Sequence, residues 1–148
     1  MKALEFGQFL WMVTRFDNDG MVSKTVHPYM VFRINEPFGY VEAIQFDSLE
    51  GKEYRVASEK YKVVFNSDPK ERVLYKDSFA VLDYTFRFEL FEDLKRFRMT
   101  PEKLSFEKRM QVQTAYESYH RKHNIPESHQ IYMSKEEIKE LNPIGLVL

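Results

Sequence analysis

The residues best suited to chemistry are His27 and the cations near it in the sequence. His27 lies in the stretch KTVHPYMVFRI, directly before a proline and a run of residues typical of a β-strand. An imidazole can both accept and donate a proton close to neutral pH. Arg15, Lys24 and Arg33 are its neighbours along the chain. A proton carrier beside fixed positive charges is what cleavage of a phosphodiester needs, so these three cations are predicted to bind RNA.

Two other interpretations of the histidines stay open at this point. His27 can be a loop residue beside a proline with no catalytic role. His120 and His123 are three residues apart, a spacing that can serve a metal, but no carboxylate or third histidine completes the set. Cations at that place also suit the end of a helix. We therefore expect no metal and no cofactor.

The composition indicates one compact, soluble unit. The chain has 148 residues, enough for one core, and no cysteine, which excludes thiol nucleophiles and disulfides. The net charge of −1 gives no general attraction to nucleic acid, so an RNA site needs a local basic patch. No stretch approaches the ~20 apolar residues that span a bilayer, and no signal sequence is visible. We expect a cytoplasmic protein without a membrane partner.

Short strands should fill the first two thirds of the chain, and helices the last third. A single domain, 1–148, is predicted, with a β barrel over about 6–99, a packed helix over 100–123 and a tail with a short helix over 124–148. The expected strands are 9–16, 29–34, 40–46, one or two within 52–57 and 61–65, and 78–90 with a bend near Asp83.

Capping residues indicate where the two helices begin. Thr100 and Pro101 form a favourable helix start, and the apolar spacing from Phe106 predicts a helix through about His123. Ser134 and Glu137 match a capping box for a second, short helix.

The order of several segments resembles the MazF/PemK-like toxin family. VHPYMVFRI is followed one turn later by YVEAIQFDS, and KDSFAVLDYTFRF (76–88) then resembles the family's late strand. FGQFLWMVTRFD resembles its first strand, and LSFEKRMQVQTAYESY its carboxy-terminal helix. The resemblance covers about residues 6–119, and the order of the motifs carries it.

The resemblance implies a small, curved, antiparallel SH3-like barrel with helical additions, usually a homodimer. It also implies metal-independent endoribonuclease activity on single-stranded RNA, with a protein antitoxin as partner. The family's catalytic arginine position matches His27, and its catalytic threonine position matches Gln45, with Ser48 three residues further on. His27, Gln45 and Ser48 are therefore the candidate catalytic residues.

The alternative is a non-catalytic module that binds protein or nucleic acid on the same barrel, because a fold alone does not determine activity. Both readings predict a core that includes Val31, Ile44, Val81 and Leu82, with the 106–120 helix packed on the sheet. The enzyme further requires His27 at a partly open groove, with Gln45 or Ser48 facing the same space.

Overall fold

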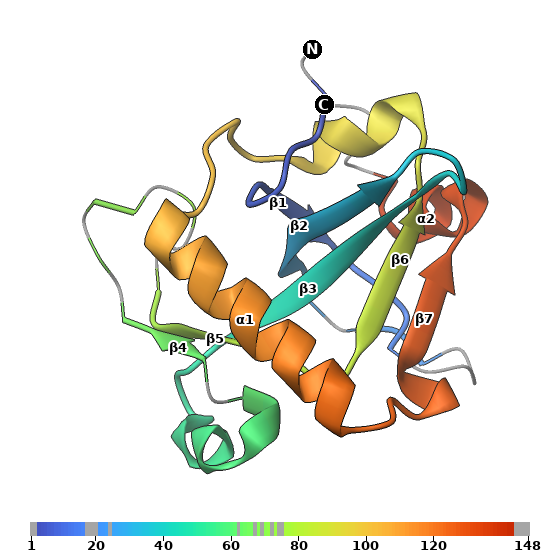
Figure 1. The fold of residues 1–148 in the computed structure, drawn as a ribbon. Helices are drawn as coiled ribbons and strands as arrows, with labels where there is room; N and C mark the ends of the chain where they lie inside the picture. The colour runs from blue at the N-terminus through green and yellow to red at the C-terminus, as the bar shows by residue number, and fades with distance from the viewer. Residues whose placement is uncertain are drawn as a thin grey trace.

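The computed structural model describes residues 3–16, 21–23, 25–61, 63–66, 68, 70–71, 73 and 76–143. They form a mainly β, mostly antiparallel open sheet of seven strands with a few helices (Figure 1). The strands are β1 (Phe9–Met12), β2 (His27–Asn35), β3 (Tyr40–Ser48), β4 (Val64–Phe65), β5 (Ser78–Ala80), β6 (Thr85–Glu89) and β7 (Gln130–Met133). The α-helices are α1 (Phe106–Lys122) and α2 (Lys135–Leu141), and the 3₁₀ helices are η1 (Glu53–Ala57), η2 (Glu59–Tyr61), η3 (Glu92–Phe97) and η4 (Glu127–His129).

The hairpin of β2 and β3 is the centre of the sheet. Gly39, which has a φ of +72°, closes its turn by donating its N–H to the carbonyl of Asn35. β3 then has two partners along its length, because Tyr40–Ala43 pair with β6 while Phe46–Ser48 pair with β5. This change of partner bends the sheet and gives the strand order β1-β2-β3-β5-β4, with β6 and β7 branching from β3.

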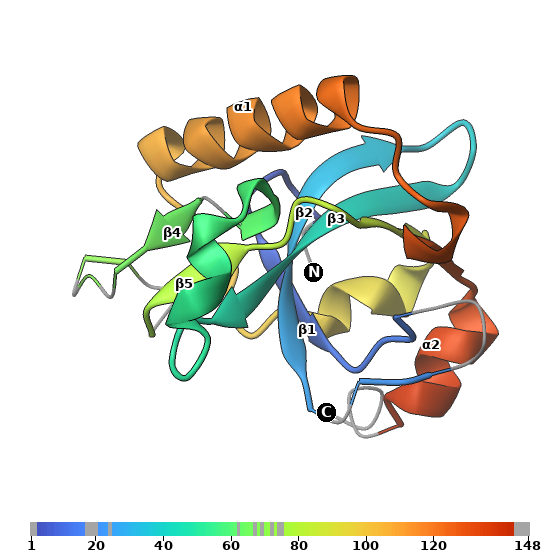
Figure 2. The same cartoon turned by 90° about the horizontal axis from the view of Figure 1, so that it is seen from below.

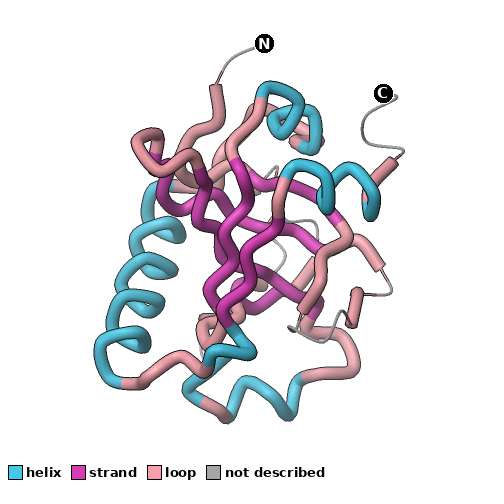
Figure 3. Tube along the Cα trace, turned by 90° about the vertical axis from the view of Figure 1, so that its right-hand side faces the viewer, coloured by secondary structure: helices cyan, strands magenta, loops and turns pink. Residues whose placement is uncertain are grey.

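Both faces of the sheet are buried, and strand alternation divides its side chains between two clusters. In β2, Met30 and Phe32 belong to the cluster under α1, whereas Tyr29 and Val31 belong to the opposite cluster with η3 and α2. Figures 2 and 3 show α1 on one side of the strands and η3 and α2 on the other. Val112 and Tyr116 are the fully buried residues of α1, so this helix is packed on the sheet as expected.

The carboxy-terminal segment belongs to the sheet and is more than a tail. β7 pairs in parallel with β6, the one parallel pairing among the described strands. Ser134 caps α2 by accepting a hydrogen bond from the Glu137 N–H, as the capping box predicts. Asn142, at the other end of α2, exchanges two hydrogen bonds with the backbone of Val13, at 2.7 and 2.9 Å. The end of α2 is thereby tied to the segment that follows β1.

Most element boundaries agree with the sequence expectations. The break between β5 and β6 lies at the predicted bend near Asp83, α1 ends one residue before His123, and the four predicted core residues are buried. Coarsely, a mainly β fold with carboxy-terminal helices is confirmed. Among the described residues, no helix combines the length and apolar character that crossing a bilayer requires.

Four local expectations were wrong. Residues 53–57 form η1 instead of a strand, and the 61–65 strand shortens to Val64–Phe65. β1 ends at Met12, although an isolated bridge joins Arg15 to Val22 further along. The long helix begins at Phe106 and not at Thr100, whose hydroxyl accepts from the Glu102 N–H in a local turn instead. At η1 and at Thr100 a short polar segment satisfies its hydrogen bonds locally, which sequence patterns do not distinguish from a strand or a helix start.

The tie between Asn142 and Val13 yields a stability prediction. Asn142→Ala removes both hydrogen bonds to Val13 and leaves a largely buried N–H and carbonyl unpaired. We expect the free energy of unfolding to fall by about 1–3 kcal/mol. Urea denaturation measures it, with Asn124→Ala, the same change at an exposed loop position, as the matched control. Equal stability of the two variants would contradict the tie.

His120 yields a pH prediction. Burial between α1 and the sheet lowers the pKa of its imidazole below the ordinary value of 6.5, although its ring nitrogen bonds the Leu82 carbonyl at 2.8 Å. The unfolded chain therefore binds a proton at higher pH than the folded chain does, so this group weakens the fold as pH falls below about 6.5.

We expect His120→Gln to reduce the loss of unfolding free energy between about pH 7.5 and about pH 5.5. Denaturant titrations at both pH values measure this difference, with His123→Gln at the exposed end of the same helix as control. An unchanged pH dependence in His120→Gln would refute the effect.

Candidate functional site

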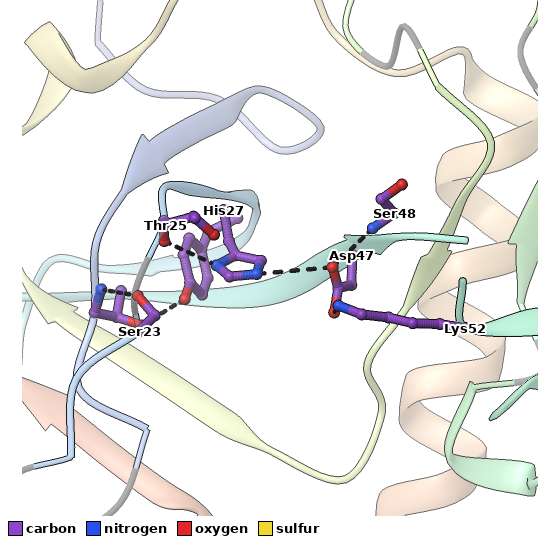
Figure 4. A network of polar contacts seen from close by, with 8 residues as sticks. Ser23, Thr25, His27, Asp47, Ser48 and Lys52 are labelled. Atoms are coloured by element: carbon purple, nitrogen blue, oxygen red, sulfur yellow. Dashed lines mark hydrogen bonds and ion pairs between the residues drawn. The ribbon is translucent and has the colours of Figure 1, made fainter. Parts of the chain in front are cut away.

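The register of the central hairpin brings His27 and Asp47 together. β2 and β3 are antiparallel, and Tyr29 pairs with Gln45. Carried two residues outward, that register places His27 opposite Asp47, at the start of one strand and near the end of the other. The Nε2 atom of His27 lies 3.7 Å from Oδ1 of Asp47, and the two side chains are 19% and 13% exposed. Figure 4 shows the imidazole directed toward this carboxylate.

Both ring nitrogens of His27 face oxygen atoms. Nδ1 lies 3.1 Å from the carbonyl oxygen of Thr25, while Nε2 faces Asp47. The cationic form of the ring can donate to both acceptors, whereas a neutral ring can donate to one. Neither nitrogen is directed at the hydroxyl of Ser48. The arrangement therefore suits a proton donor better than the base of a serine nucleophile.

Asp47 is held by two further donors. Lys52 reaches one carboxylate oxygen, Oδ2, at 2.7 Å, and the backbone N–H of Ser48 donates to the other at 2.8 Å. Figure 4 shows His27 and Lys52 approaching the carboxylate from opposite sides. These two hydrogen bonds fix the position of the Asp47 carboxylate, which then faces the His27 ring from a set position.

A cavity of about 420 Å³ lies at the ends of these strands. Its walls carry a cation, hydroxyls and large apolar groups side by side. The lining residues are Trp11, Thr25, Val26, His27, Pro28, Asp47, Ser48, Lys76, Ser78 and Met99. Strand alternation sends His27 and Asp47 to one face of the sheet and Ser48 to the other. Residues of both faces line the cavity because it lies where the strands end.

A buried pair supports the strand that carries His27. The hydroxyl groups of Tyr29 and Thr14 are hydrogen-bonded to each other, and both side chains are buried. Burial raises the pKa of the Tyr29 phenol, the bond to Thr14 acts against this, and the nearby Asp47 charge adds to it. Tyr29 therefore stays neutral and serves as a rigid support next to the site.

The structure brings together two of the three predicted catalytic residues. His27 and Ser48 both line the cavity. Gln45 pairs with Tyr29 on the inner part of β3 and is not among the lining residues.

The predicted RNA-binding cations lie elsewhere or outside the described residues. Arg15 forms an ion pair with Glu137 of α2 at 2.8 Å, and Arg33 stacks over the Phe32 ring near Glu117 of α1. Neither arginine lines the cavity. Lys24 lies outside the residues that the structure describes.

Four residues at or beside the cavity were not predicted from the sequence. Asp47, Lys76 and Trp11 line the cavity, and Lys52 pairs with Asp47. A signal for Asp47 was present, because pairing 27–35 with 40–48 as one hairpin places it opposite His27. Lys76 directly precedes the predicted late strand, at the same end of the sheet. Trp11 was read only as part of a strand.

The other histidines have local structural partners. His123 lies 3.1 Å from a carboxylate oxygen of Glu59, and His129 stacks on Tyr84 while bonding the Asp83 carbonyl. Within the part of the chain that the structure describes, no group of three or more His, Asp or Glu side chains could hold a metal ion.

Comparison with known proteins identified no similar protein. No protein-family model matches the chain, and no curated protein or solved structure matches it either. The geometry of the site and the resemblance of the sequence segments are therefore the grounds for assigning a function.

Proposed function

We propose that the protein is a metal-independent endoribonuclease that cleaves single-stranded RNA at the cavity of His27. The observation that carries the proposal is the convergence of a histidine, its carboxylate partner and a lysine on one cavity. The resemblance of the segments to MazF/PemK-like toxins points to the same activity, and to a barrel of that SH3-like type for the sheet.

The reaction is an internal transfer of the phosphoryl group. The ribose 2′-oxygen attacks the neighbouring phosphorus and releases its proton to solvent water, the bond from phosphorus to the 5′-oxygen breaks, and that oxygen takes a proton from His27. The products are a 2′,3′-cyclic phosphate and a free 5′-hydroxyl, and no water is consumed. The nucleophile belongs to the substrate, so the protein needs no nucleophile of its own, and DNA, which lacks the 2′-hydroxyl, is not cleaved.

Each side chain of the cavity has a role in this reaction. His27 donates the proton to the departing 5′-oxygen, as suits a ring directed at two acceptors. Asp47 is the positioning residue that orients His27 and balances its charge. Lys76 and the Ser48 hydroxyl contact the phosphate oxygens, on which negative charge accumulates in the transition state.

A second candidate, from a different class, is a non-catalytic binding module. One observation favours it: both nitrogens of His27 and both oxygens of Asp47 already have partners within the protein. Such a network can serve only to hold the strand ends together. Incubation with RNA distinguishes the two, because a module binds RNA or protein but leaves RNA intact.

The proposal includes the partners that the resemblance implies. A protein antitoxin would inhibit such an enzyme by covering the cavity, and a homodimer would place two cavities in one particle. Size-exclusion chromatography with light scattering tests the dimer directly.

The role of His27 predicts a large loss of activity on its removal. His27→Ala should lower the rate of cleavage of a mixed-sequence single-stranded RNA about 10²–10⁴-fold, the usual contribution of a positioned acid or base. Gel analysis with a chelator present measures the rate, and His123→Ala is the matched control because that histidine lies at the C-cap of α1 and does not line the cavity. Wild-type rates in His27→Ala would assign this histidine a structural role, and RNA left intact by the parent protein would favour the binding module.

The positioning role of Asp47 predicts non-additive effects. Asp47→Asn keeps an acceptor for the Ser48 N–H but removes the charge that faces His27. We expect it to slow cleavage by itself and to have little further effect in a His27→Ala background, because residues in contact are energetically coupled. A double-mutant cycle on the cleavage rate measures the coupling. Fully additive effects would show that Asp47 does not act through His27.

A further inference from the structure

Four side chains of one sheet face, in two neighbouring pairs, lie near the ends of β1, β2, β3 and β5. Trp11 pairs with Pro28, and Ser48 pairs with Ser78. All four line the cavity, and Trp11 is partly buried against the core cluster that contains Phe46. The indole is thus supported from behind by the core while it borders open space.

Two exposed apolar side chains lie beside these four residues. Val26 is 52% exposed and Met99 is 68% exposed, and both line the same cavity as Trp11. Isolated exposed apolar residues are ordinary, but two of them beside a partly exposed indole around one cavity are typical of a site that binds a flat or apolar group.

The polar groups that line the cavity indicate which kind of flat ligand it can bind. Within the described part of the chain the ammonium of Lys76 has no carboxylate partner, whereas Lys52 is paired with Asp47. Ser78 donates to the Lys76 carbonyl, whereas the hydroxyls of Ser48 and Thr25 can turn toward a ligand. A flat aromatic surface next to a lysine and a hydroxyl is complementary to a nucleobase joined to a phosphate.

We infer that Trp11, with Val26 and Met99, forms a subsite that stacks one unpaired base of single-stranded RNA. The base lies against the indole, and its phosphate reaches around the strand ends toward Lys76 and His27. This inference rests on the proposed action of the cavity on RNA, and it makes Trp11 a determinant of affinity with no part in proton transfer. Stacking tolerates every base, so Trp11 contributes binding more than sequence preference.

Trp11 is the only tryptophan of the chain, so its fluorescence reports on the subsite alone. The probe is a mixed-sequence oligoribonucleotide with 2′-O-methyl groups, which cannot be cleaved because the nucleophile is blocked. We expect it to quench the wild-type emission and to protect the indole from acrylamide. A fluorescein-labelled form of the same probe measures affinity by anisotropy in all variants.

Trp11→Ala should weaken binding about 5- to 150-fold, the range measured for loss of one stacked base. Trp11→Phe keeps a smaller ring and should lose less. Phe38→Ala removes an exposed aromatic ring at the hairpin turn, at the opposite end of β2 and β3, and should bind as the parent does. Circular dichroism checks that each variant folds. If Trp11→Ala does not fold, quenching of the wild-type emission by the probe still decides the question.

The outcomes separate this inference from the proposed catalysis. Binding with quenching, lost in Trp11→Ala, supports the subsite whether or not unmodified RNA is cleaved. Cleavage of RNA by the parent with no quenching and unchanged affinity in Trp11→Ala overturns the subsite and leaves the catalytic proposal standing. Absence of any binding, or equal losses in Trp11→Ala and Phe38→Ala, also overturns it.

Discussion

The antiparallel pairing of β2 with β3 is the interaction on which the rest of the structure depends. These are the two longest of the described strands, and their pairing, with one bulge between Val31 and Arg33, fixes which side chains meet. At the inner positions it sets Val31 against Ala43 in the core. At the outer end it sets His27 against Asp47 and so creates the candidate site. A slip of one residue would turn every one of these side chains to the opposite face.

Because both faces of the sheet are buried, a change of this register would cost much free energy. One buried polar contact then fixes the position of α1 on the sheet. Glu42 of β3 is 7% exposed, and it accepts a hydrogen bond from the Tyr116 hydroxyl at 2.9 Å, with Arg87 at 3.8 Å. A buried carboxylate requires such partners. Burial, and secondly the Glu42 charge, raise the pKa of Tyr116, so this phenol remains a donor. The helix therefore has one position along the sheet in which Glu42 is satisfied.

The sequence predicts the features that depend on neighbouring residues and fails on those that depend on distant ones. The hairpin, the bend near Asp83 and the Ser134 cap follow from local pattern. β7 does not, because its parallel pairing with β6 joins segments about forty residues apart and is supported by α2 and Asn142. The site behaves likewise: His27 is recognisable from its type, whereas Asp47 and Trp11 become relevant only through strand pairing. Arg15 and Arg33 were assigned by closeness in sequence, and the fold directs them to Glu137 and Glu117.

The position of the site at the strand ends explains how a polar network and a partly exposed indole are compatible with an apolar core. Asp47 and Lys52 are paired and keep partial access to water, so their charges are less desolvated than they would be in the middle of the sheet. Trp11 and Phe46 lie on the same face, and the core beneath the indole gives it rigidity that a loop residue would lack. The paired strands thus hold the side chains in fixed positions, and the location at the strand ends leaves the cavity open to a ligand. The proposed ligand, single-stranded RNA, alternates flat bases with anionic phosphates and so matches a cavity that residues of both faces line.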